Sequence, residues 1–141
     1  MQVSKILVQL RGDDSDTDAV NLACILGRKY HAKIYAVYVI IVRLTLPMDT
    51  ELKSETEKAE NVLEHMRAMV ESQSCQMEKI IIKTREAGQA IIEAVNEYAV
   101  DLIVIVINNM RRFGQFSLGS TVPYILKNAP CQVILYQQHT P

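Results

Sequence analysis

The residues best suited to chemistry lie in one stretch, between a buried apolar segment and a helix start. Residues 102–107 (LIVIVI) are all aliphatic and predict a strand buried on both faces. Gly119, Ser120 and Thr121 then open a helix, whose free backbone N–H groups would suit an anion, above all a phosphate. Because a strand, a loop and a helix start in this order form a crevice at the carboxyl edge of a parallel sheet, we predict a ligand pocket here.

The loop between this strand and this helix is basic. Arg111 and Arg112 lie in it, followed by Gly114. Two interpretations of the arginine pair are equally good: a cationic lip on the pocket, or two exposed surface charges. The sequence leaves both open.

Composition places the chain among ordinary globular proteins. It has 141 residues, enough for one domain (1–141) with a real core. The net charge of −1 favours no nucleic-acid partner, since such partners usually require a basic excess. No apolar run approaches the roughly 20 residues of a membrane helix, and the first ten residues do not read as a signal peptide. We therefore expect a cytoplasmic protein without a membrane segment.

Cysteines and histidines predict no metal site. The three cysteines are far apart and lack metal-ligand spacing, so we interpret them as buried or incidental thiols in a reducing cytoplasm. They are Cys24, Cys75 and Cys131. The three histidines also fall in unrelated places.

Strands and helices are predicted to alternate strictly. The predicted strands are Val3–Leu10, Lys33–Val42, Met77–Thr84, Asp101–Ile107 and Cys131–Gln137. The predicted helices run from Ser15 to about Tyr30, from Glu51 past Val70, from about Gly88 to Tyr98 and from Ser120 to Asn128. The order βαβαβαβαβ indicates an α/β fold: a single doubly wound domain, with a five-stranded parallel sheet and helices on both faces.

Two helix starts carry local signals. Ser15 and Asp18 predict a capping box for the first helix. Ser120 is predicted to cap the last helix, where Pro123 occupies the first turn and its missing N–H costs nothing. Asp13 and Asp14 are expected near the positive end of the first helix.

Other doubly wound folds lack their signatures. The segment 11–14 (RGDD) does not supply the G-x-G-x-x-G of a dinucleotide-binding domain, and a phosphate loop of the G-x-x-x-x-G-K type is absent as well. A phospho-acceptor receiver domain would use the Asp13-Asp14 pair, but it also needs an aspartate at the end of the third strand. That strand ends in Lys83-Thr84, so the receiver interpretation is rejected.

The whole chain resembles the universal stress protein family. The resemblance is carried by the order of elements, by ILV at 6–8 in the first strand, and by FSLGSTVPYILKNAPCQVILY at 116–136. It implies the strand order 3-2-1-4-5. It also implies a homodimer formed through the last strand, Cys131 to Gln137.

The resemblance is incomplete where the family binds nucleotide. Many members bind ATP with glycine, two residues, glycine, nine residues, then glycine and Ser or Thr. Gly119-Ser120 matches the end of this pattern, but Val106 and Asn109 replace its two earlier glycines, and Arg11 replaces an aspartate. Asn109 is the mildest change, because Asn tolerates positive φ. A branched Val106 side chain would occupy space that a nucleotide needs, and Arg11 could pair with a phosphate instead of a ribose or a metal.

Two functions follow from this resemblance. The first is a small regulatory or stress-response protein whose pocket binds ATP, AMP, another adenine nucleotide or another phosphorylated ligand. Its predicted site residues are Arg11, Asn109, Arg111, Arg112, Gly119, Ser120 and Thr121. The second is a dimeric interaction module that binds no nucleotide. We find no nucleophile–base pair, so we expect no dedicated enzyme, and a weak nucleotide hydrolase has no support in the sequence.

Overall fold

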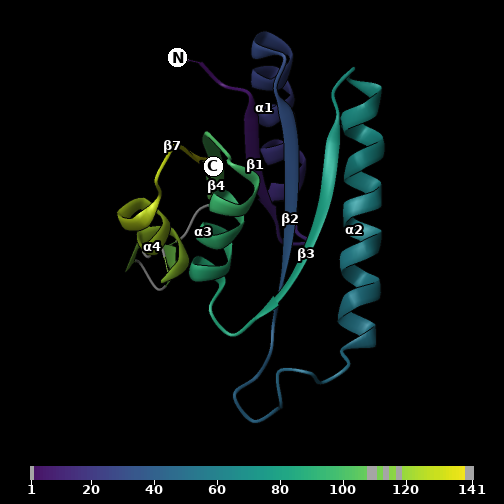
Figure 1. The fold of residues 1–141 in the computed structure, drawn as a ribbon, viewed down its shortest axis with the longest axis vertical. Coiled ribbons are helices and arrows are strands. Elements are labelled where there is room, and N and C mark those ends of the chain that lie inside the picture. Colours follow the sequence, from purple (N-terminus) through teal and green to yellow (C-terminus); the bar gives the residue numbers. More distant parts are fainter. Residues whose placement is uncertain (1, 108–110, 113–114, 117–118, 139–141) are drawn as a thin grey trace.

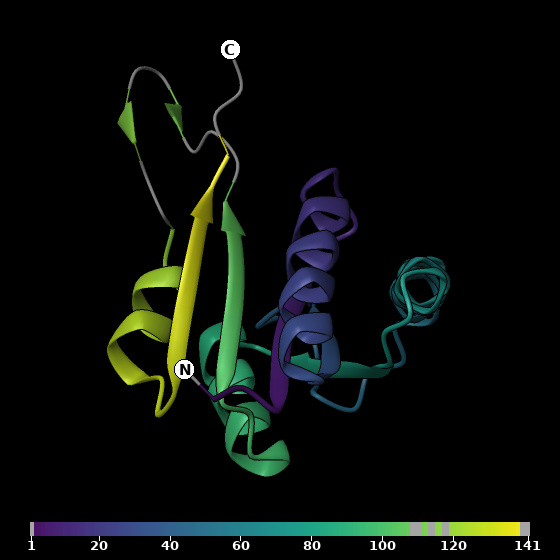
Figure 2. The same ribbon diagram turned by 90° about the horizontal axis from the view of Figure 1, so that it is seen from above.

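The computed structural model shows a doubly wound α/β domain (Figures 1 and 2). It describes residues 2–107, 111–112, 115–116 and 119–138. The strands are β1 (Lys5–Leu10), β2 (Lys33–Ile41), β3 (Met77–Thr84), β4 (Leu102–Ile107), β5 (Arg111–Arg112), β6 (Gln115–Phe116) and β7 (Gln132–Gln137). The helices are α1 (Ser15–Tyr30), α2 (Lys53–Ser72), α3 (Ala87–Tyr98) and α4 (Thr121–Asn128).

Five parallel strands form the main sheet in the order β3-β2-β1-β4-β7. This confirms the predicted 3-2-1-4-5 topology. The chain winds outward in one direction from β1 through β2 to β3, and in the other direction from β4 to β7. The order therefore reverses between β1 and β4, and doubly wound sheets bind ligands beyond the carboxyl ends of the strands at such a point.

Two apolar cores cover the two faces of the sheet. On one face, α1 and α2 pack over alternate residues of the central strands, including Ile6, Val8 and Val104. On the other face, α3 and α4 cover Leu7, Ile103 and Ile105. All six residues of β4 are buried, because this strand is enclosed on both faces by helices and on both edges by β1 and β7.

Several predicted boundaries shift by one or two residues. β1 begins at Lys5 rather than Val3, and the backbone N–H groups of Ser4 and Lys5 both bond to the Asp101 carboxylate. α2 begins at Lys53, two residues after the predicted start, and β7 begins at Gln132. Such shifts are usual where a helix or strand frays at its end.

The predicted capping box at the start of α1 was wrong. Ser15 does not cap α1, because it lies inside the helix and donates from both its N–H and its hydroxyl to Asp13 Oδ1. Asp18 takes no part in a capping box either, since its carboxylate accepts a hydrogen bond from Gln138. The predicted basic loop after β4 includes a short antiparallel pair, β5 with β6, which Figure 2 shows beyond the carboxyl ends of β4 and β7.

The described helices include none that is both long enough and apolar enough to cross a membrane.

Candidate functional site

A buried carboxylate fixes the turn that follows β1. Asp16 is 1% exposed, and its two oxygens accept the backbone N–H groups of Arg11 at 2.8 Å and Gly12 at 2.7 Å. Gly12 has φ +79°, a conformation that favours glycine. Burial raises the pKa of Asp16, although both hydrogen bonds act in the opposite direction. The first turn of α1 therefore holds the end of β1 in one conformation.

Side chains from β2 and α2 close over this turn. A Cβ atom added to Gly12 would lie 3.2 Å from Lys58 Cε and 3.4 Å from the Tyr38 hydroxyl. The Lys58 ammonium thus lies above the turn, although Lys58 itself is exposed. This lysine was not among the predicted site residues, because it belongs to a helix whose charged face gave no sign of approaching β1.

Arg11 crosses from the end of β1 to the end of β4. The pairing of the two strands runs from Ile6 with Leu102 to Val8 with Val104. Beyond it, Arg11 Nη1 donates a hydrogen bond to the Val106 carbonyl oxygen at 3.0 Å. The guanidinium therefore spans the strands where their backbone pairing has ended.

Val106 places its side chain in the core. The side chain is 4% exposed and belongs to the core on the α1 and α2 face. What Val106 offers beyond the sheet is its carbonyl oxygen, which Arg11 engages.

At the start of α4, glycine and serine have separate roles. Gly119 has φ +68°, while a Cβ added there would meet nothing within 4 Å, so backbone conformation and not space favours glycine. Ser120 occupies the N-cap position, as predicted, but its side chain makes no capping hydrogen bond. Ser120 is exposed and Thr121 is half-buried.

Ser120 and Thr121 line a pocket of about 230 Å³ with the start of α3. The remaining lining residues are Glu86, Ala87, Gly88, Gln89 and Tyr124. The first turns of two helices therefore face one hollow, and their combined dipoles favour an anion there. The exposed Glu86 carboxylate opposes that preference.

Gly88 lets the two helices approach each other. A Cβ at this position would lie 2.7 Å from Tyr124 Cδ1, closer than side chains pack. Gly88 is also buried. The sequence showed a glycine near a helix start, but not that the residue faces another helix.

The predicted site residues divide into separate groups. Within the described part of the chain, Arg11 does not line the pocket of Ser120 and Thr121. A different hollow, of about 400 Å³, lies between the start of α1 and α2, and its lining includes Asp13, Asp14 and His65. Among the described residues no group of three or more His, Cys, Asp or Glu could hold a metal ion.

The remaining predicted residues lie in the segment between β4 and α4. Asn109 is outside the described residues. Arg111 and Arg112 form β5, with Arg111 paired to Phe116 and Arg112 to Gln115. Their assignment to the site stays a prediction.

Comparisons with known proteins agree on one family. Residues 2–137 match the Universal stress protein family. A universal stress protein of Methanocaldococcus jannaschii is 26% identical over 140 residues, which is 95% of this chain and 82% of that protein.

Solved structures share the fold. Universal stress protein UspA from Lactobacillus plantarum has a TM-score of 0.78 at 22% identity, over 96% of this chain and 99% of that one. The universal stress protein from Archaeoglobus fulgidus in complex with dAMP has a TM-score of 0.74 at 18% identity, over 96% and 98%. With the family match spanning nearly the whole chain, this protein belongs to the universal stress protein family.

Proposed function

We propose that this universal stress protein is a small regulatory protein that binds an adenine nucleotide or another phosphorylated ligand at the carboxyl edge of its sheet. The observation that carries the proposal is the pocket where the first turns of α3 and α4 converge on Ser120 and Thr121. The starts of α3 and α4 lie at the carboxyl edge of the parallel sheet, the edge at which doubly wound folds bind ligands. A structural relative of the same fold was solved with dAMP.

The phosphate of the ligand is proposed to lie against the start of α4. Backbone N–H groups in the first turn of a helix lack partners within the helix and are suited to bind an anion. The Ser120 hydroxyl is not used in a cap, so it can donate to a phosphate oxygen. Thr121 presents a second hydroxyl from the next position.

Arg11 is proposed to neutralise the ligand from the other side of the crevice. One of its nitrogens bonds to Val106, and a guanidinium carries five N–H donors. The others can pair with a phosphate while the contact to β4 is kept. Asn109, Arg111 and Arg112 remain candidates for the same pocket from their place in the sequence.

The test measures ligand binding directly. Melting temperature and calorimetric affinity are compared for ATP, ADP, AMP, cyclic AMP and inorganic phosphate. We expect at least one adenine nucleotide to raise the melting temperature, and Ser120→Ala to weaken its binding. Ser54→Ala is the matched control, because Ser54 is an exposed serine in the first turn of α2. If all five ligands leave the melting temperature unchanged and no nucleotide co-purifies, the binding proposal is lost.

A second candidate function is supported by the two edges of the sheet. The β3 edge carries exposed Lys79 and Lys83, which discourage another strand from pairing there. The β7 edge, QVILYQ, has no charged residue, and Leu135 and Tyr136 are 38% and 46% exposed. This contrast supports a homodimer through β7 that acts as an interaction module.

The dimer has its own test, in which the two edges serve as a matched pair. Leu135→Lys on β7 is compared with Ile81→Lys on β3, since these side chains are 38% and 36% exposed. Light scattering after size exclusion should show a dimer for the unmodified protein and for Ile81→Lys, and a monomer for Leu135→Lys. A monomeric unmodified protein, or a dimer lost equally in both variants, contradicts assembly through β7.

A further inference from the structure

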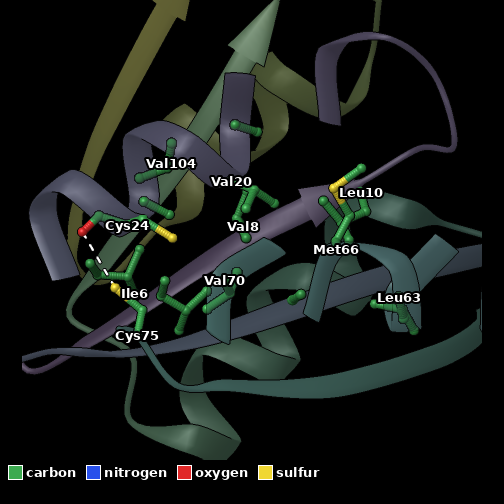
Figure 3. Close-up of a cluster of buried hydrophobic side chains, with 14 of the residues drawn as sticks. Ile6, Val8, Leu10, Val20, Cys24, Leu63, Met66, Val70, Cys75 and Val104 are labelled. Carbon is green, nitrogen blue, oxygen red and sulfur yellow. Dashed lines mark hydrogen bonds between the residues drawn. The ribbon is translucent and has the colours of Figure 1, made fainter. Parts of the chain in front are cut away.

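Two cysteines lie next to each other in the core on the α1 and α2 face. Cys24 is on α1 and Cys75 is in the turn between α2 and β3, 51 positions later. Cys75 Sγ donates a hydrogen bond to the Cys24 carbonyl oxygen at 3.6 Å, and Figure 3 shows the Cys75 sulfur directed at that oxygen. Both cysteines are free.

The local backbone brings Cys75 against α1. Ser74 has φ +63°, so the chain turns sharply just before Cys75. A Cβ added to Gly27, one helical turn after Cys24, would lie 3.8 Å from Cys75 Sγ, an ordinary van der Waals distance. The Cys75 sulfur is therefore held beside the same turn of α1 that carries Cys24.

Access to the two thiols is unequal. Cys24 is 0% exposed, whereas Cys75 is 9% exposed. Cys75 also lines two surface hollows of about 480 and 490 Å³ at the amino end of the sheet. The first of these contains the basic residues Arg28, His31 and Lys33. A small molecule that enters either hollow can contact Cys75, whereas Cys24 lines neither of them.

We propose that Cys75 and Cys24 form an oxidation site, in which a hydroperoxide oxidises Cys75 and Cys24 then closes a disulfide with it. The ligand class is a small peroxide, hydrogen peroxide or a compact organic hydroperoxide. The site lies at the amino end of the sheet, away from the crevice at the carboxyl edge, and does not depend on the proposed nucleotide binding.

The chemistry balances in two steps. The Cys75 sulfur attacks one peroxide oxygen and the O–O bond breaks, which gives a sulfenic acid at Cys75 and releases water or an alcohol. The Cys24 sulfur then attacks the Cys75 sulfur, the S–OH bond breaks, and the hydroxyl leaves as water with the Cys24 proton. Overall, the two thiols lose two electrons and two protons, and the peroxide is reduced.

The environment supports this order of events. Burial, together with the neighbouring Cys75 thiol, raises the pKa of Cys24 to about 12, so Cys24 is protonated at rest and is not the thiol that attacks the peroxide. It gives up its proton only as it attacks the oxidised Cys75. A bridge requires the Cys75 sulfur to leave the Cys24 carbonyl and the Cys24 side chain to rotate toward it. The dithiol is thus the resting form, and the disulfide forms only after Cys75 has been activated by oxidation.

The test follows all three cysteines in the full chain. Reduced protein is treated with hydrogen peroxide, quenched with an alkylating agent under denaturing conditions and mapped by mass spectrometry. We expect a Cys24–Cys75 disulfide that dithiothreitol reverses, with Cys131 still alkylated. Cys131 is the internal control, because it is half-buried and burial raises its pKa too, yet it has no cysteine beside it.

Single variants separate the two roles. In Cys24→Ala, Cys75 should accumulate as a sulfenic acid that dimedone traps. In Cys75→Ala, Cys24 should remain a thiol at peroxide doses that convert the unmodified protein. Circular dichroism checks that each variant is folded. The disulfide mapping on unmodified protein does not depend on either variant. The proposal is overturned if Cys131 is oxidised while Cys24 and Cys75 remain thiols, or if Cys75 reaches the sulfinic acid without forming a disulfide.

Discussion

Arg11 donates a hydrogen bond to the carbonyl oxygen of Val106, with 3.0 Å between nitrogen and oxygen, and so links β1 to β4 beyond the end of their backbone pairing. The two residues are 95 positions apart in the chain. In the family pattern, they occupy positions of an aspartate and a glycine. The two replaced positions are therefore in contact. The Arg11 guanidinium donates to the Val106 carbonyl oxygen, whereas a carboxylate at position 11 has no proton to donate and would repel that oxygen.

Replacing Arg11 should weaken both the fold and phosphate binding. A hydrogen bond from a charged donor contributes about 1.5–3 kcal/mol, and because Arg11 is half-buried we place Arg11→Ala near the lower limit. Arg11→Lys keeps the positive charge but loses the planar guanidinium. Compared with Arg11→Ala, it should therefore restore more of the ligand affinity than of the folding stability. Urea unfolding and nucleotide calorimetry on both variants check this. Equal stability of all three proteins would show that the link to β4 contributes nothing.

Asp16 should give the protein an unusual pH dependence. Its folded pKa is raised above the ordinary value of 3.8, so its contribution to stability is fully present below that value and is lost as pH rises through the folded pKa. Asp16→Asn removes this titration, but it also replaces an acceptor of two backbone N–H groups, which should cost about 1–3 kcal/mol.

The measurement is the free energy of unfolding of both proteins from about pH 3.5 to about pH 7. The advantage of the unmodified protein over Asp16→Asn should decrease as pH rises. Asp14→Asn is the control, since Asp14 is an exposed neighbour of the same turn. A difference that grows with pH would mean that the folded pKa of Asp16 is lowered.

The sequence predicted the sheet better than it predicted the site. The parallel sheet followed from the alternation of elements and from the six aliphatic residues at 102–107, which predict a strand buried on both faces. The strand order came from the family resemblance alone. Contacts between residues that are distant in the chain could not be predicted, because they produce no local pattern in the sequence. Examples are the hydrogen bond from Arg11 to Val106 and the packing of Gly88 on Tyr124. The predicted capping box is not formed because Ser15 lies inside α1, where its N–H and hydroxyl donate to Asp13.

Gly88→Ala should separate α3 from α4. The new methyl group would lie 2.7 Å from Tyr124 Cδ1, and such overpacking typically costs about 1–3 kcal/mol. Alanine also favours helix by up to about 1 kcal/mol, which offsets part of the loss. A double-mutant cycle with Tyr124→Ala isolates the contact. We expect Gly88→Ala to be destabilising alone and neutral or stabilising when Tyr124 is already alanine.

Glu86→Gln should strengthen ligand binding. The Glu86 carboxylate lines the same pocket as Ser120 and Thr121 and opposes a phosphate there. Removing this negative charge, which repels the phosphate near a helix start, should improve the binding free energy by about 0.3–1 kcal/mol, which corresponds to a two- to fivefold lower Kd. Glu93→Gln is the control, because Glu93 is exposed on the same helix but does not line the pocket. The effect should fade at high salt, and a Kd unchanged by Glu86→Gln would place the phosphate outside this pocket.

Oxidation of the Cys24–Cys75 pair to a disulfide should raise the free energy of unfolding, and the size of the increase reports how much strain the bridge causes in the core. A crosslink between residues 51 positions apart restricts the unfolded chain and, by loop entropy alone, stabilises the fold by about 4 kcal/mol. Rotation of Cys24 inside a packed core works against this gain, since rotamer strain and displaced neighbours commonly cost about 1–3 kcal/mol. We therefore expect oxidised protein to unfold at a higher urea concentration than reduced protein, with a smaller difference than loop entropy alone predicts.

Cys75→Ala treated with the same peroxide shows whether this shift in urea midpoint requires the disulfide. Oxidised protein that unfolds more easily would mean that core strain exceeds the entropic gain, and that the pair acts to loosen α1 and not to fasten it.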